Sequence, residues 1–403
     1  MLCRQTMRVF FLLKNTYPKG LASTARVHCY SKGFVGKGIE TNVLLPISFE
    51  KQGSEQRNTE EEGVDEMGVH FQYMSGSPFR SGNFFKRHVK DVYGYVYTLL
   101  YIYRHIKQDD QVIVYEGGVL WMMVCAMVVH LKGAKATMEL NELPYVTKNQ
   151  TKKRVFHRQC MLRLAFPRYD QFIVISEPLK EIVQRYAPKA RIIKVPIMVD
   201  VDELAYDTPD ESPIQAPYLF HAGSLTHNKD GILGMVEAFG KTCEKTDKPI
   251  KFLMTGKLED SPQKAIIQEL ITKYHLEDKL CFLGYLENNE LYRYLRHGVL
   301  CIINKYDNQQ NKYCFSNKLG EYLAMARPVI ITNVGEAMNY LKDGKNAYMI
   351  PPKNTDLMAE KILEIINHPE DAERIGREGQ HLAKTIFDCN YQAKRLIDFF
   401  QSA

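Results

Sequence analysis

Two α/β domains are the fold that this sequence predicts, and three observations indicate it. Short β-branched apolar runs alternate with longer stretches of helical periodicity, which is typical of an α/β fold with mainly parallel sheets. The chain has 403 residues, which is too many for one typical core. A polar, acidic, proline-containing segment, residues 200–217, separates two series of such elements. We therefore expect doubly wound domains over residues 1–199 and 218–387 with this segment as the linker.

The apolar runs predict strands, and the 3.6-residue periodicity predicts helices. In the first half, strands are expected at residues 8–13, 41–45, 69–73, 111–115, 136–140 and 172–175, and helices at 22–33, 84–107, 120–131 and 178–186. In the second half, strands are expected at 218–221, 250–255, 280–283, 299–303 and 329–332, and helices at 231–246, 263–274, 290–296, 356–367 and 369–387. A last helix lies within residues 388–403, and we expect it to pack back toward the first domain.

Composition limits the class of protein. The hydrophobic fraction of 45% and the charged fraction of 25% are ordinary for a soluble globular chain. Nine cysteines are scattered without C-x-x-C or metal-ligand spacing, which favours a reducing compartment. No cleavage site follows the first residues, and the apolar run 119–129 is too short to span a bilayer. We expect a cytoplasmic protein, peripheral at the inner face of the membrane.

The positive charge belongs to the first half of the chain. Residues 1–199 hold 29 Lys and Arg against 17 Asp and Glu, whereas residues 213–403 hold 24 of each kind. Lys148 to Arg168 is the densest basic part; it holds no acidic residue and has apolar residues interleaved. This amphipathic pattern predicts contact with an anionic membrane surface or a polyanion, and the alternative is a solvated helix face. Nucleic acid is not expected, because no zinc-finger, RRM, KH or helix-turn-helix signature is present.

One segment, residues 313–333, carries charges that packing does not explain. Its apolar residues recur at helical spacing on one face: Leu319, Tyr322, Leu323 and Ala326. Ser316 is in position to cap this helix, and Lys318 and Glu321 lie on the side away from the apolar face. A helix N-terminus is a common phosphate site, while an i,i+3 salt pair on a solvated surface is the simpler interpretation.

Two glycine-containing turns each follow the first strand of a domain. Residues 223–231 read Gly-Ser-Leu-Thr-His-Asn-Lys-Asp-Gly and open a helix, so they could hold an anion. Gly20 lies in the equivalent turn of the first domain and could let the backbone approach a ligand closely. Plain strand–turn–helix connections explain both turns equally well.

Two carboxylates follow neighbouring strands of the first domain. Glu116 precedes Gly117-Gly118, and Glu142 lies in Asn141-Glu-Leu-Pro144. Carboxylates at strand ends can orient sugar hydroxyls or transfer protons, so Glu142 and Glu116 are the candidate catalytic residues. Surface placement is the alternative.

Taken in order, these elements resemble a retaining glycosyltransferase of family 4, with the GT-B fold of two Rossmann-like domains facing a central cleft. The resemblance covers residues 218–400 through the turn 223–231, the Phe-Leu-Gly-Tyr at 282–285 and the Asn-Lys-Leu-Gly-Glu-Tyr-Leu-Ala at 317–324. Downstream, Gly335-Glu336 and the segment 343–352 continue it. The first domain matches more loosely, through Pro18-Lys-Gly20 and Asn141–Pro144.

The resemblance implies a role for each matched residue. Glu321 corresponds to the second carboxylate of the family's E-x7-E motif and would bind the ribose hydroxyls of a nucleotide diphosphate sugar. The diphosphate would be held by Lys229, Lys318 and the backbone N–H groups at the start of the helix. The other residues implied for the donor site are Gly20, Ser224, Tyr285, Phe315, Ser316 and Asn317. No metal or other cofactor is implied.

The sequence departs from the family pattern at Tyr313, which replaces the first carboxylate, and at Ser224, where an Arg is frequent. The leading hypothesis is transfer of a sugar with retention to a glycan or lipid-linked acceptor, in surface polysaccharide biosynthesis. A nucleotide-sugar 2-epimerase of the same fold and a non-catalytic glycan- or membrane-binding relative are the alternatives.

Overall fold

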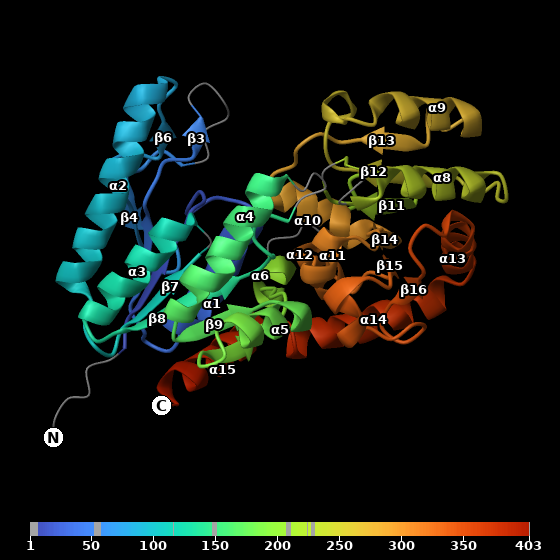
Figure 1. Cartoon of the computed structure of the whole chain (residues 1–403). Coiled ribbons are helices and arrows are strands. Elements are labelled where there is room, and N and C mark those ends of the chain that lie inside the picture. The colour runs from blue at the N-terminus through green and yellow to red at the C-terminus, as the bar shows by residue number, and fades with distance from the viewer. Residues whose placement is uncertain are drawn as a thin grey trace. The chain divides into compact units, whose positions relative to one another are not determined.

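The computed structural model describes residues 7–51, 58–115, 117–146, 151–206, 211–223, 225–226 and 230–402. They form two compact units (Figure 1). Unit 1 comprises Met1–Pro196 with Cys389–Ala403, and unit 2 comprises Ile197–Asp388. The expected linker, residues 200–217, falls within unit 2, and a short helix, α6 (Val201–Tyr206), begins there.

Unit 1 is built on an eight-stranded sheet of order β10-β9-β8-β7-β1-β2-β5-β4. Neighbouring strands are parallel except β4 and β5, which are antiparallel. The strands are β1 (Val9–Leu12), β2 (Thr41–Leu45), β4 (Glu62–Val64), β5 (His70–Tyr73), β7 (Gln111–Val114), β8 (Lys135–Leu140), β9 (Gln171–Val174) and β10 (Arg191–Lys194). A separate parallel pair is formed by β3 (Glu50–Lys51) and β6 (Phe79–Arg80).

The helices of unit 1 are α1 (Ala22–Val35), α2 (Phe84–His105), α3 (Val119–Leu131), α4 (Lys152–Cys160), the π-helix η1 (Met161–Ala165), the 3-10 helix η2 (Phe166–Arg168), α5 (Glu177–Tyr186) and α15 (Cys389–Gln401). The C-terminal helix α15 packs against α1, and the buried Sγ atoms of Cys29 and Cys389 lie 3.3 Å apart. A buried ion pair joins α1 to the central sheet, with Arg26 Nε 2.6 Å from Glu139 Oε1.

Unit 2 holds a six-stranded sheet of order β13-β12-β11-β14-β15-β16, parallel throughout. Its strands are β11 (Tyr218–His221), β12 (Lys251–Met254), β13 (Leu280–Phe282), β14 (Leu300–Ile303), β15 (Val329–Thr332) and β16 (Tyr348–Ile350). Besides α6, its helices are α8 (Ile232–Cys243), η3 (Leu258–Asp260), α9 (Lys264–Tyr274), α10 (Asn288–His297), α11 (Gln309–Tyr313), α12 (Asn317–Ala324), η4 (Gly335–Asn339), α13 (Thr355–Asn367) and α14 (Pro369–Thr385).

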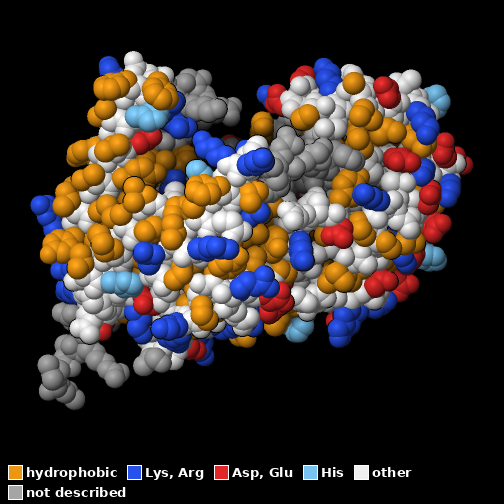
Figure 2. All heavy atoms as spheres, in the orientation of Figure 1, with side chains coloured by type: hydrophobic (Ala, Val, Ile, Leu, Met, Phe, Trp, Pro, Cys, Tyr) orange, Lys and Arg blue, Asp and Glu red, His pale blue; other side chains and the backbone are white. Residues whose placement is uncertain are grey.

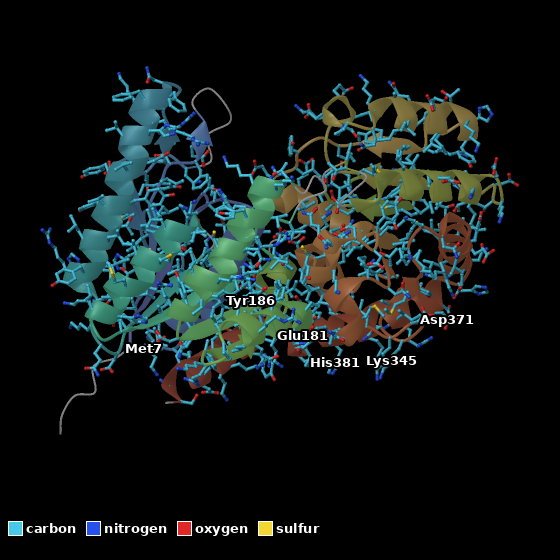
Figure 3. The ribbon with its side chains drawn as sticks, in the orientation of Figure 1. Met7, Glu181, Tyr186, Lys345, Asp371 and His381 are labelled. Carbon is cyan, nitrogen blue, oxygen red and sulfur yellow. The ribbon has the colours of Figure 1, made fainter. Side chains whose placement is uncertain are left out.

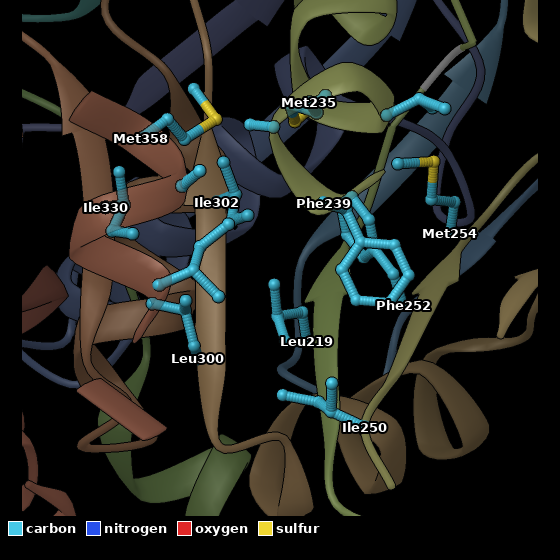
Figure 4. Packing of buried hydrophobic residues seen from close by; sticks show 14 of the residues in the cluster. Leu219, Met235, Phe239, Ile250, Phe252, Met254, Leu300, Ile302, Ile330 and Met358 are labelled. Atoms are coloured by element: carbon cyan, nitrogen blue, oxygen red, sulfur yellow. The ribbon is translucent and has the colours of Figure 1, made fainter. Parts of the chain in front are cut away.

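The core of unit 2 lies where this sheet meets its helices, as Figure 4 shows. Phe239 of α8 meets Phe252 of β12 edge to face, with ring centroids 5.4 Å apart. Burying two such rings stabilises the unit by about 1.5–3 kcal/mol each. At the surface, α14 points Asp371 and His381 into solvent (Figure 3). Asp371 lies in the first turn, where a carboxylate suits the helix dipole.

The order of the strands fixes where ligands can bind. In unit 2 the chain adds β12 and β13 on one side of β11 and then crosses to β14 on the other side. Ligands of doubly wound sheets bind beyond the carboxyl ends of the strands at such a reversal. The segments that follow β11 and β14 therefore form the expected binding edge. In unit 1 the equivalent reversal lies between β1 and β7.

The prediction of an α/β fold with mainly parallel sheets is confirmed. The strands predicted at 41–45, 218–221 and 329–332 have those bounds in the structure. Sequence analysis did not predict β16 as a strand; it covers only three residues and forms an edge of the sheet.

Candidate functional site

The candidate site is formed by α12 together with the segment that follows β11. On α12, Leu319, Tyr322 and Leu323 are fully buried, as their spacing predicts. Lys318 and Glu321 lie on the other side of the helix and are only half-buried. Ser316 is at the N-cap position, but its side chain makes no capping hydrogen bond.

Lys318 forms an ion pair with a residue that sequence analysis did not single out. Its Nζ atom lies 2.9 Å from Oδ1 of Asp230, whose side chain is 5% exposed. Burial alone would raise the pKa of Asp230, but the charges of Lys318 and Lys305 and the hydrogen bond from Lys318 together lower the pKa to about 2. The Asp230 carboxyl is therefore ionised at neutral pH. Lys318 keeps further N–H groups for another acceptor, because an ammonium has three.

A buried histidine at the end of β11 faces the same place. Nδ1 of His221 lies 2.9 Å from the carbonyl oxygen of Ile302, which can only accept, so Nδ1 carries the proton. Nε2 is then a bare acceptor, and it has no hydrogen-bond partner in the described part of the chain. Burial, with the Lys318 charge, lowers the pKa of His221 to about 4. The imidazole is neutral at pH 7.

The backbone at Gly223 brings these groups together. A Cβ atom at this position would overlap the Lys318 amine and lie 3.0 Å from Nε2 of His221. Glycine is therefore required for Lys318 to lie against the segment after β11. Two hydrogen bonds fix that segment: Ala222 N–H donates to the Tyr322 hydroxyl at 2.7 Å, and Gly223 N–H donates to Thr255 Oγ1 at 2.7 Å.

Glu321 is the residue of α12 that its surroundings explain least. Its carboxyl makes no hydrogen bond and no ion pair with the described residues, although Lys318 is one helical turn away. Burial raises the pKa of Glu321 to about 7, and the positive charge of Lys318 opposes that change only in part. A carboxyl that is partly desolvated without a partner costs free energy, and carboxyls with a raised pKa are concentrated at functional sites.

The other residues predicted for the donor site play different parts. The Phe315 ring is buried, stacked on Tyr340 at 5.5 Å and edge-on to Phe387 at 5.7 Å, so its side chain packs the unit. Asn317 is the first residue of α12. Tyr285 follows β13 with its side chain 73% exposed. Tyr313, which replaces the first motif carboxylate, ends α11.

Three of the predicted residues, Glu116, Ser224 and Lys229, lie outside the described residues. Glu142 is exposed after β8 of unit 1. Gly20 lies between β1 and α1, where a Cβ atom would overlap the Thr24 side chain, so packing within the turn already accounts for this glycine. No group of three or more His, Cys, Asp and Glu side chains with metal-binding geometry occurs among the residues that the structure describes.

Sequence reasoning found Lys318 and Glu321 but missed His221 and Asp230. A signal was available for both, because His221 is a polar residue at the last position of a buried strand and Asp230 lies within the predicted turn 223–231. Their proximity to Lys318 was not visible, since Asp230 and Lys318 are 88 residues apart in the chain.

The chain has two α/β units with mainly parallel sheets and a polar site at the strand reversal of the second sheet. The fold is GT-B, as the sequence predicts. Sucrose-phosphate synthase from Thermosynechococcus elongatus has the same fold, with a TM-score of 0.73 and 14% identity over 98% of both chains. Anabaena Alr3699/HepE in complex with UDP-glucose gives a TM-score of 0.70 with 13% identity, over 98% of this chain and 100% of that one.

The comparison with protein families is more specific for unit 2. Residues 208–382, which include His221, Asp230, Lys318 and Glu321, match the family model "Glycosyl transferases group 1". Sucrose synthase from Melioribacter roseus is 26% identical over 175 residues, which are 40% of this chain and 21% of that protein. The N-acetyl-alpha-D-glucosaminyl L-malate synthase of Bacillus anthracis is 21% identical over 50% of this chain and 51% of its own length.

The match spans about a quarter or less of the two sucrose synthases that resemble this chain, the second being from Thermosynechococcus vestitus. Together, the structural neighbours show that the chain has the GT-B fold, and the family match shows that residues 208–382 are similar to the glycosyl transferases group 1.

Proposed function

We propose that this chain is a retaining glycosyltransferase of family 4 that takes a sugar from a nucleoside diphosphate sugar bound to unit 2. The carboxyl of Glu321 is the observation that carries the proposal. It is half-buried, without a partner among the described residues, and burial raises its pKa to about 7. A vicinal diol supplies the two O–H donors that such a carboxylate lacks, and the ribose of a nucleotide offers a diol.

The charges of the site bear on how the diphosphate would be held. Asp230 and Lys318 neutralise each other, and the charge of Lys305, which also acts on Asp230 and His221, opposes that of ionised Glu321. These charges together give the described site no net attraction for a diphosphate. We therefore assign the anion to the N–H groups at the start of α12, with the free N–H bonds of Lys318, and to Lys229 of the turn 223–231. Ser224, Tyr285, Phe315, Ser316 and Asn317 complete the proposed donor site of unit 2.

Negative charge develops on the leaving diphosphate during transfer. Fixed N–H dipoles and ammonium groups stabilise it without reorganising, so the proposed reaction needs no metal. Glu142 and Glu116 of unit 1 are the proposed residues for proton transfer or for orienting the acceptor. Activity that is the same in EDTA and in Mg²⁺ is the expected result.

The donor nucleotide to test first is uridine diphosphate. Anabaena Alr3699/HepE and the pneumococcal O-GlcNAc transferase GtfA were both solved in complex with UDP. The basic excess of residues 1–199 supports a polyanionic glycan or a lipid-linked acceptor, as in surface polysaccharide biosynthesis at the inner face of the membrane.

Calorimetric titration of UDP and UDP-sugars into the full chain tests the donor site. Glu321→Ala is expected to weaken binding by about tenfold to a hundredfold, because a charge-assisted hydrogen bond is lost. Glu378→Ala, an exposed carboxylate on α14, is the matched control and should bind as the parent does. Equal affinities for all three proteins would remove the basis of the proposal.

Tyr313, in the place of a family carboxylate, favours a second candidate, a relative that binds without catalysis. Release of nucleoside diphosphate in the presence of acceptor distinguishes transfer from binding. Formation of a free epimerised nucleotide sugar, without acceptor, would instead indicate the 2-epimerase.

A further inference from the structure

The long helix α2 of unit 1 exposes the side that its sequence makes apolar. Besides Phe84 at its first position, α2 exposes seven large apolar residues, each at least 44% exposed: Phe85, Val89, Val92, Tyr93, Val96, Leu100 and Tyr103. Most of these seven are three or four residues from the next, which places them in one stripe along the helix. An amphipathic helix of a soluble unit normally turns such a stripe toward the core.

The opposite side of α2 shows why the stripe faces outward. The buried residues of this helix are Gly94, Thr98 and Ile102, at intervals of four. A Cβ atom at Gly94 would overlap the carbonyl oxygen of Pro46, so the helix lies against the segment after β2 through small residues. The packing of unit 1 therefore fixes the orientation of α2, with its bulky side chains on the outer surface.

The apolar surface continues onto neighbouring elements. α2 packs on α3, and α3 packs on η1. Leu120, Met127 and Leu131 of α3 are 54–74% exposed, and Leu164 of η1 is 44% exposed. Figure 2 shows hydrophobic side chains gathered over α2 and α3. Scattered exposed apolar residues need no explanation, but a contiguous patch across three elements indicates an interaction surface.

The charge of these elements indicates which kind of partner binds this surface. The segments that hold α2, α3 and η1, residues 84–107, 117–133 and 161–165, together contain seven Lys and Arg and one acidic residue, Asp91. In a symmetric contact between two copies, this excess would face itself and repel. An anionic bilayer is complementary, because lysines and arginines meet lipid phosphates while Phe, Leu and Val enter the acyl boundary. Tyrosines such as Tyr93 and Tyr103 suit the headgroup level.

We propose that the face formed by α2, α3 and η1 docks unit 1 onto the surface of an anionic membrane. α2 is capped by Asn83, whose side chain accepts from Lys86 N–H at 3.1 Å, so it is a preformed helix lying on the bilayer. No helix among the described residues has the length and apolarity needed to cross a bilayer. This surface overlaps the predicted stretch Lys148–Arg168 only at η1, and α2 provides its main apolar stripe. The proposal does not depend on glycosyl transfer.

Flotation of the full chain with vesicles tests this directly. One set is phosphatidylcholine, and the other is an equimolar mixture with phosphatidylglycerol. Phe85→Ser/Val92→Ser should lose at least about tenfold in affinity for the anionic vesicles. Lys86→Ala/Lys90→Ala should lose roughly fivefold per removed charge, since each basic residue near the surface contributes about that factor. Val64→Ser/Ile266→Ser, at exposed apolar positions outside the patch, is the matched control.

The proposal requires that the parent and the control float with anionic vesicles and that the patch variants do not. Val96→Ser/Leu100→Ser provides an independent variant of the same stripe should the first one misfold. Thermal midpoints equal to that of the parent show that each variant is folded. The proposal is overturned if the parent fails to float, if the patch variants float as well as it does, or if light scattering shows a dimer that Phe85→Ser/Val92→Ser converts to monomers.

Discussion

Replacing Glu321 by glutamine should stabilise unit 2 while weakening its ligand binding. Burial raises the pKa of this carboxyl from 4.5 to about 7. At about 1.4 kcal/mol per tenfold change in proton affinity, ionising it in the folded protein costs up to about 3 kcal/mol. The side chain is half-buried, so solvent screening reduces the expected gain from Glu321→Gln to about 1–2 kcal/mol.

The difference in stability between Glu321→Gln and the parent depends on pH, and the pKa shift determines its direction. Below pH 4.5 the carboxyl is protonated in the folded and in the unfolded chain, so the substitution has little effect. Between 4.5 and about 7 the unfolded chain ionises while the folded protein stays protonated, so the stability of the parent falls as pH rises. Above pH 7 the full cost is present, and the advantage of Glu321→Gln is largest there.

Urea denaturation at about pH 5 and about pH 8 measures this effect, with Glu378→Gln on α14 as the exposed control. The expected gain is well below 1 kcal/mol at the lower pH and about 1–2 kcal/mol at the higher pH. Added UDP should raise the thermal midpoint of the parent more than that of Glu321→Gln. A substitution that destabilises the chain at both pH values would show that the carboxyl has a stabilising partner and would refute the reasoning.

The remaining predictions concern the ion pair, the histidine and the packing of α2. Lys318→Ala should destabilise the chain by about 1–3 kcal/mol, because it removes the ion-pair partner 2.9 Å from the buried Asp230 carboxylate; denaturant titration measures this, and Lys318→Ala/Asp230→Asn should recover part of the loss, whereas equal losses in the single and double variants would contradict the coupling. His221→Gln should make the stability of the chain less sensitive to acid. The pKa of His221 is lowered to about 4, so the parent loses stability as the pH falls from 6.5 toward 4. An unchanged pH profile of the thermal midpoint would contradict this. Gly94→Val should destabilise unit 1 by about 1–3 kcal/mol, because the new side chain would overlap Pro46, and it should leave the UDP affinity of unit 2 unchanged. Gly38→Val is the comparison for backbone strain alone, since a Cβ atom there would have free space but φ is +73°.

Much of the fold could be predicted because burial and chain order dominate it. The apolar runs at Val9–Leu12 and Val329–Thr332 are buried at every position, and such runs read as strands without knowledge of their neighbours. The short edge strands β4 and β16 could not be predicted. Their pairing depends on β5 and β15, and their own residues carry no strong periodicity.

The residues of the site could be predicted from the sequence only where they lie on one helix. The apolar face of α12 identifies Lys318 and Glu321 as residues that do not pack into the core. In the structure both lie half-buried on the other side of the helix. The contact of Lys318 with Asp230 depends on how β11 and β14 come together, which a pattern within one segment does not reveal. The outward apolar stripe of α2 is a similar case. The helical period shows that α2 has an apolar face, but the close contact of Gly94 with Pro46 determines which face is buried.

The central claim is that Glu321 and the start of α12 bind a nucleoside diphosphate. Isothermal titration of UDP into the full chain, the Glu321→Ala variant and the Glu378→Ala control tests it most directly. The account predicts equal affinity for the parent and the control and a loss of about tenfold to a hundredfold for Glu321→Ala. UDP binding of the same strength in all three proteins would contradict it.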